Sequence, residues 1–203
     1  MMLNHRLIIV ILSLSVLLSG CGGSLLGAPE AASKTYVLNA TIEPVETNRL
    51  NKVLLVDEPK SQPGFDTPYI AYTRGPLELD YYTKSEWADT PARMLTPLVV
   101  QALEASDGFQ AVVVPPTPAE GDLRLELDII RLQQEFIDTP SESRLTIRAK
   151  LFDVNRRNVL ATRVFEVRKP APSEDAYGGV QAANAAVGDF LQQLVEFVLE
   201  QRR

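Results

Sequence analysis

Hydrophobic and charged residues alternate along two stretches in the second half of the chain. In residues 122–129, DLRLELDI, leucine or isoleucine fills every second position and charged side chains lie between them. Residues 144–151 repeat this pattern, and a polar turn at 153–158 leads to a third stretch at 159–168. Because successive side chains of a strand point to opposite faces, the pattern predicts an antiparallel meander with one buried and one charged face.

Shorter apolar runs come earlier in the chain, and their β-branched and aromatic residues are typical of strands. Gly75-Pro76 separates two of these runs, which predicts a hairpin between them. The expected strands are residues 35–39, 52–56, 69–73, 79–82 and 109–114.

A helix is expected between the hairpin and the meander. Thr90 has the position of an N-cap, and Pro91 follows at the first helical position. Apolar residues then recur at helical spacing as far as Asp107. Pro97 lacks an amide hydrogen, so we expect a kink or a second helix start after Thr96.

The last stretch of the chain predicts a long helix that Ser173 or Asp175 can cap. Its apolar stripe is expected to pack on the sheet, and the alternative is a partner-binding surface. The stripe consists of Ala183, Val187, Phe190, Leu191, Leu194 and Val198. Together the elements predict the α/β class, with a mixed, largely antiparallel β-sheet packed by helices.

The first 20 residues have the features of an export signal. Asn4, His5 and Arg6 form a polar, positive start, and residues 7–18 form an apolar run. As a helix this run is about 18 Å long, which is shorter than the hydrocarbon core of a bilayer and typical of a signal peptide.

The signal ends in LSGC at residues 18–21, which resembles the lipobox of bacterial lipoproteins. The resemblance implies that Cys21 is acylated and attaches the chain to the membrane; the alternative is a secretory signal with an accidental cysteine. Gly22 follows, and the absence of Asp at this position implies the outer membrane of a Gram-negative bacterium, facing the periplasm. The expected organisation is a signal peptide (1–20), a lipidated cysteine with a flexible Gly/Ala/Ser-rich tether (21–34) and one domain (35–203).

The amino-acid composition excludes several kinds of binding, metal and catalytic site. Without the signal, the chain has 19 basic and 26 acidic residues, which argues against nucleic-acid binding. His5, the only histidine, lies in the signal, so the remaining chain cannot form a Ser-His-Asp triad or a histidine metal site. Cys21 is the only cysteine, which excludes an internal disulfide and a thiolate zinc site. We therefore expect no cofactor and no metal, and the composition leaves carboxylate-only chemistry and Ser-Lys pairs open as catalytic arrangements.

One catalytic alternative stays open. Glu126 and Asp128 share the charged strand face, roughly 6.6 to 6.8 Å apart along the strand, a separation that a carboxylate-based hydrolase could use. Arg124 and the basic residues of 144–150 are expected nearby, so a salt-bridged sheet face is the other interpretation.

Several short motifs, in this order, suggest a family. After the lipobox come YTR at 72–74, the strand at 79–82, Trp-Ala at 87–88 before the proline-started helix, the charged meander, Phe-Glu at 165–166 and the Ala-rich last helix. Over most of residues 35–200 this arrangement resembles the ABC-type transport auxiliary lipoproteins.

The resemblance implies a mixed α/β sandwich similar to the amino-terminal, anticodon-binding-like domain of the Tol-system protein TolB. It implies a non-catalytic outer-membrane adaptor of an MCE-type lipid transport system. The partners would be a periplasmic MCE-domain protein and, through it, an ABC permease and ATPase, and the chain would form a homo-oligomeric ring. The alternative is an outer-membrane assembly or secretion lipoprotein.

One segment is rich in the aromatic and arginine side chains that anchor protein interfaces. Its candidate partner-binding residues are Tyr72, Arg74, Tyr81, Tyr82 and Trp87. The alternative is that Trp87 and one or two of the tyrosines fill the core.

Overall fold

The computed structural model describes residues 33–43 and 49–201, which belong to one unit that spans Ser33–Arg203. The predicted signal peptide, Cys21 and residues 21–32 of the predicted tether lie outside the described residues. The strands are β1 (Lys34–Tyr36), β2 (Val53–Val56), β3 (Lys60–Ser61), β4 (Tyr69–Thr73), β5 (Asp80–Trp87), β6 (Ala111–Val113), β7 (Leu123–Glu135), β8 (Glu142–Asp153) and β9 (Asn158–Pro170), and the helices are α2 (Pro91–Ala105) and α3 (Ala176–Glu200).

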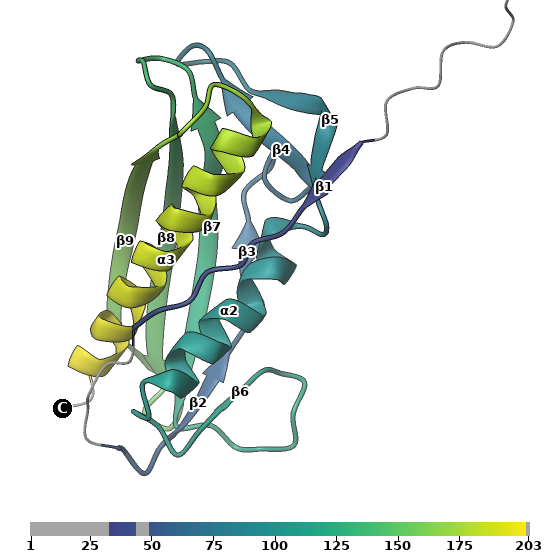
Figure 1. The fold of residues 1–203 in the computed structure, drawn as a ribbon. Coiled ribbons are helices and arrows are strands. Elements are labelled where there is room, and N and C mark those ends of the chain that lie inside the picture. Colours follow the sequence, from purple (N-terminus) through teal and green to yellow (C-terminus); the bar gives the residue numbers. More distant parts are fainter. Residues whose placement is uncertain (1–32, 44–48, 202–203) are drawn as a thin grey trace, which may run out of the picture. The chain divides into compact units, whose positions relative to one another are not determined.

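The predicted meander is confirmed. β7, β8 and β9 pair antiparallel in sequence order, with Leu125 opposite Leu151 and Glu126 opposite Lys150. The register shifts by one residue between Ile129 and Arg131, which is a β-bulge. The fold class is confirmed as well, because this largely antiparallel sheet is packed by two helices (Figure 1).

The other edge of β7 makes the sheet mixed. Along its length β7 pairs parallel with β2, then β3, then β4. β6 adds parallel to β2, while β5 adds antiparallel to β4 and β1 adds parallel to β5. The hairpin of residues 69–73 and 79–82 is therefore confirmed, with its second strand longer than predicted, and the strands predicted at 35–39 and 109–114 are shorter.

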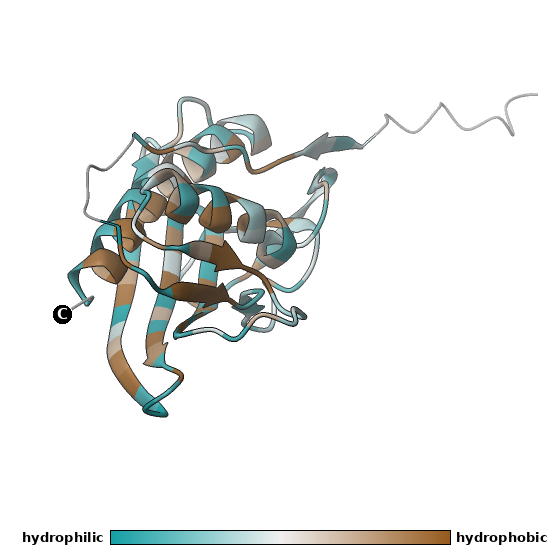
Figure 2. Ribbon diagram, turned by 90° about the horizontal axis from the view of Figure 1, so that it is seen from below, coloured by the Kyte–Doolittle hydropathy of each residue, from teal (hydrophilic) through white to brown (hydrophobic). Residues whose placement is uncertain are grey.

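Both helices cover one face of the sheet, and the core lies between (Figure 1). Apolar and polar residues alternate along the long strands, as the bands in Figure 2 show. The predicted stripe of α3 is buried on this face, and Asp175 caps the helix by accepting a hydrogen bond from the Gly178 amide. Neither described helix is long and apolar enough to cross a membrane.

α2 does not restart after Thr96, so the expected second helix start is wrong. The helix continues through Pro97, whose ring is exposed, and Leu95, Leu98 and Val99 are buried on either side of it. Burial of the apolar face offsets the single backbone hydrogen bond that a proline removes.

A strap of chain, Val37–Glu43, follows β1 and runs between α2 and α3 (Figure 1). Leu38 is buried in the core. The Asn39 amide donates to Oδ1 of Asn184 over 2.6 Å, and Nδ2 of Asn184 donates to the Val37 carbonyl over 3.3 Å. The strap thus connects the start of the domain to the middle of α3.

Candidate docking surface

Three connections meet at one end of the sheet, which we call the hairpin end (Figure 1). They are the β4–β5 turn (74–79), the β7–β8 loop (136–141) and the segment before α3 (171–175). The Phe136 amide donates to the Thr73 carbonyl over 2.9 Å, and the Ala171 amide donates to the Ser141 carbonyl over 2.7 Å. These hydrogen bonds hold the three connections together.

An aromatic cluster lies at the hairpin end, and we define it as Tyr72, Arg74, Tyr82 and Phe136. The ring centroid of Tyr72 lies 4.8 Å from that of Tyr82 and 5.9 Å from that of Phe136. The Arg74 guanidinium lies 5.0 Å from the Tyr72 centroid and 5.7 Å from that of Phe136. Arg74 is exposed and makes no ion pair with any carboxylate in the described part of the chain. The cluster therefore offers a cation and half-buried aromatic surface.

The half-buried Tyr82 fixes the cluster to the sheet. Its hydroxyl donates to Oε1 of Gln134 over 2.8 Å. Burial and, to a smaller extent, the neighbouring Tyr72 raise the pKa of Tyr82 to about 12. The hydroxyl is therefore a neutral donor at physiological pH, and it stabilises a buried amide.

The other two predicted residues lie elsewhere. The Tyr81 hydroxyl donates to the Gly64 carbonyl over 3.1 Å, and its ring lies 5.9 Å from that of Tyr69. Trp87 is only 3% exposed and belongs to the core, so the core alternative describes it. Phe136 was not predicted, although an aromatic residue directly after the alternating stretch of β7 was a signal for it.

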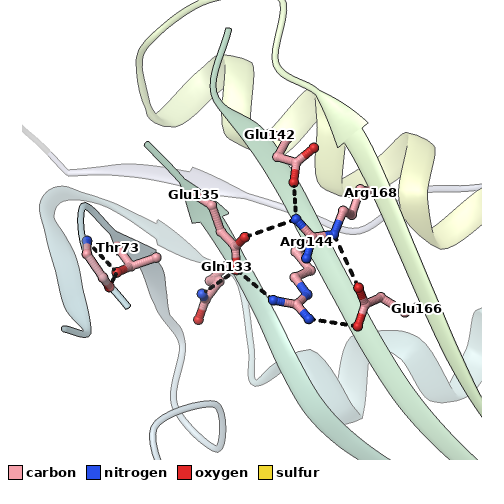
Figure 3. Close-up of polar contacts among 8 residues, drawn as sticks. Thr73, Gln133, Glu135, Glu142, Arg144, Glu166 and Arg168 are labelled. Carbon is pink, nitrogen blue, oxygen red and sulfur yellow. Dashed lines mark hydrogen bonds and ion pairs between the residues drawn. The ribbon is translucent and has the colours of Figure 1, made fainter. Parts of the chain in front are cut away.

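The outer face of the sheet, opposite the helices, carries a network of ion pairs (Figure 3). Nη2 of Arg144 donates to Oε2 of Glu166 over 2.7 Å, and Arg168 pairs with Glu142 and with Glu166. Glu135 is 5% exposed and lies 3.5 Å from Nη1 of Arg144 and of Arg168. The hydrogen bond from Arg144 lowers the pKa of Glu166, and the one to Glu142 raises the pKa of Arg168.

The two carboxylates of the catalytic alternative lie on this outer face. Asp128 pairs with Nζ of Lys150 over 3.1 Å, and Lys150 is also opposite Glu126 in the register. The salt-bridged interpretation therefore describes Asp128. Among the described residues, no group of three or more His, Cys, Asp or Glu side chains could hold a metal ion.

Comparison with known proteins gives one family. The model of the family described as ABC-type transport auxiliary lipoprotein component matches residues 36–195. A comparison with curated proteins finds no match.

Solved structures share the fold. Protein XCC0632 from Xanthomonas campestris is 26% identical, with a TM-score of 0.75 over 83% of this chain and 96% of that one. The hypothetical protein CT253 from Chlamydia trachomatis is 9% identical, with a TM-score of 0.52 over 74% of this chain and 96% of that one. At its low identity, the second structure supports the fold alone.

Proposed function

Since this chain belongs to the family of ABC-type transport auxiliary lipoproteins, we propose that it is a non-catalytic adaptor which docks a periplasmic MCE-domain protein at the outer membrane. Acylated Cys21 would hold the domain at the membrane, and the MCE-domain protein would link it to an ABC permease and ATPase. The observation that carries the proposal is the aromatic cluster, in which Arg74 stacks on two rings without an acidic partner among the described residues.

The surface has the chemistry of a docking site. Aromatic rings and arginine supply most of the binding energy of protein interfaces, because they bury a large area and still donate hydrogen bonds. An acidic side chain of the partner would pair with Arg74. This ion pair would contribute more binding free energy than one with a freely moving arginine, because the rings already hold the guanidinium in place.

The proposed tether sets the reach of this surface. β1 begins at Lys34, so the 12 residues from Gly22 to Ser33 remain as tether and span at most about 43 Å when fully extended, at roughly 3.3–3.6 Å per residue. The domain can therefore stand off from the bilayer and still be held by it.

A homo-oligomeric ring is part of the proposal. β9 pairs only with β8, so one edge of this 13-residue strand is open among the described elements. Open strand edges favour pairing with another chain, and a ring of copies would cover them.

The test is affinity purification of the lipoprotein from detergent-solubilised membranes, with mass spectrometry of the bound proteins. We expect an MCE-domain protein to co-purify with the wild type, and Arg74→Glu to lower its yield at least tenfold, the effect of losing about 1.4 kcal/mol. Arg156→Glu is the matched control, because Arg156 is 79% exposed in the β8–β9 turn. Equal recovery with both variants, or recovery of a β-barrel protein in place of an MCE-domain protein, would contradict the proposal.

A further inference from the structure

A hollow opens on the outer face of the sheet at the hairpin end, and we call it the outer hollow. Its volume is about 400 Å³, which is within the range of small-molecule sites. The β4–β5 turn forms one side, and β7 with β8 forms the floor. The aromatic cluster does not line it.

The rim of the outer hollow is apolar. It is formed by Phe65, Pro76, Leu77, Leu79 and Ile137. Leu77 is 98% exposed, and Ile137 is 57% exposed. Apolar side chains gathered around one opening and left in water are typical of a surface that binds an apolar group.

The floor of the outer hollow, which β7 and β8 form, is basic. Arg131 and Arg144 both line it, and Arg131 makes no ion pair or hydrogen bond through its side chain in the described part of the chain. Nε of Arg144 is buried without a hydrogen-bond partner among these residues. Buried donors without partners are rare, and an anion would satisfy them.

The acidic residues of the lining do not cancel this charge. Glu135 is already paired with Arg144 and Arg168, and it accepts a hydrogen bond from Nε2 of Gln133 over 2.8 Å (Figure 3). The Glu78 carboxylate folds back over Gly75 in the turn. Arg131 is therefore the one charged group of the lining that neither pairs nor folds back within the described residues.

We propose that the outer hollow binds an anionic amphiphile. A carboxylate or phosphate head would accept hydrogen bonds from Arg131 and Arg144, and the start of an aliphatic chain would pack against Leu77, Leu79 and Ile137. A peptide is less suited, because β4 and β8 are each paired on both sides and offer no open strand edge. This inference is independent of the docking proposal, since the two surfaces share no side chain.

The experiment uses the full acylated chain in phosphatidylcholine vesicles that contain a photoreactive acyl probe. Three probes share one aliphatic chain and differ in the head: a carboxylate, a phosphate monoester and an uncharged glycerol. We expect the two anionic probes to label the β4–β5 turn and residues 136–141, as mapped by peptide mass spectrometry. Free inorganic phosphate in the buffer distinguishes the source of the anion, because it should displace an amphiphile only weakly if the chain contributes to binding.

Arg131→Gln should lower labelling by the anionic probes at least tenfold, which is the effect of losing one hydrogen bond to a charged group, about 1.5–3 kcal/mol. Arg156→Gln is the matched control and should label like the wild type. Leu77→Ser is the second variant, in case Arg131→Gln fails to fold. The Leu77 side chain is 98% exposed and does not support the core, so this variant should fold. It should also lower labelling by the anionic probes. The inference is overturned if the uncharged probe labels equally, if labelling maps elsewhere, or if Leu77→Ser and the folded arginine variant both label like the wild type.

Discussion

The hydroxyl of Tyr82 donates a hydrogen bond of 2.8 Å to Oε1 of Gln134, whose side chain is 2% exposed. Nε2 of Gln134 in turn donates to Oγ of Ser141 over 2.9 Å. A continuous set of hydrogen bonds thus joins β5 through β7 to the β7–β8 loop. Tyr82 of the aromatic cluster is therefore held by a buried amide.

Tyr82→Phe should destabilise the domain by about 1–3 kcal/mol, because Oε1 of Gln134 would be left buried without its donor. The measurement is urea unfolding followed by circular dichroism. Tyr177→Phe is the control, since Tyr177 is 52% exposed and should change the free energy of unfolding by less than about 0.5 kcal/mol. Equal unfolding curves for both variants would show that the hydrogen bond contributes nothing.

The same tyrosine gives an alkaline pH dependence. Burial raises the pKa of Tyr82 from 10.0 to about 12 in the folded chain. Between these values the unfolded chain loses a proton that the folded chain keeps, so the contribution of Tyr82 is complete below pH 10 and is lost as the pH rises towards 12. The difference in free energy of unfolding between wild type and Tyr82→Phe should therefore shrink across this window. A constant difference would contradict the shifted pKa.

Two glycines of α3 should respond oppositely to alanine. A Cβ on Gly179 would lie 2.1 Å from Oε1 of Gln134, whereas at Gly188 its nearest neighbour would be 3.8 Å away. Alanine is favoured over glycine in a helix by roughly 1 kcal/mol, so Gly188→Ala should raise the melting temperature. Gly179→Ala should lower it and also disturb the Tyr82 hydrogen bond. A rise for both variants would show that Gln134 can move aside at little cost.

The meander was predictable because its signal is local. Leu123, Leu125 and Leu127 alternate with charged residues over a single strand, and each strand is joined to the next by a short turn. The parallel partners of β7 were not predictable in this way. Nothing in Val53–Val56 itself specifies that it pairs with Leu123–Leu125, some 70 residues away, because burial on both faces removes the alternation.

The sequence predicted which residue types form the candidate site, but only some of the predicted residues lie together in it. Tyr72, Arg74 and Tyr82 do meet in one cluster. Trp87 has the same aromatic character but is buried, since an aromatic ring suits a core as well as an interface. The outer hollow could not be predicted, because Leu77 and Arg131 come together only when the β4–β5 turn lies beside β7.

The strap provides a further prediction. Asn184 bonds both the Asn39 amide and the Val37 carbonyl, so Asn184→Ala leaves two backbone groups of the strap without these partners. We expect faster hydrogen exchange in residues 37–43 and little change in the meander, as local opening requires less free energy than global unfolding. Gln192→Ala, also on α3, is the control and should leave the strap unchanged. Equal exchange in both variants would show that the burial of Leu38 alone holds the strap.

The proposed membrane anchor depends on acylation of the Cys21 thiol. Each buried methylene contributes about 0.8 kcal/mol, and two acyl chains suffice for stable attachment, so the proposed lipoprotein should stay with the membranes through an alkaline carbonate wash. Mass spectrometry should find a mature chain that begins at an acylated Cys21, and Cys21→Ser should abolish both the acylation and that cleavage. Gly22→Asp should keep the acyl groups and move the protein from the outer to the inner membrane in a density gradient. A mature terminus at another residue, with the Cys21 sulfur bare, would remove the anchor and with it the proposed geometry of docking.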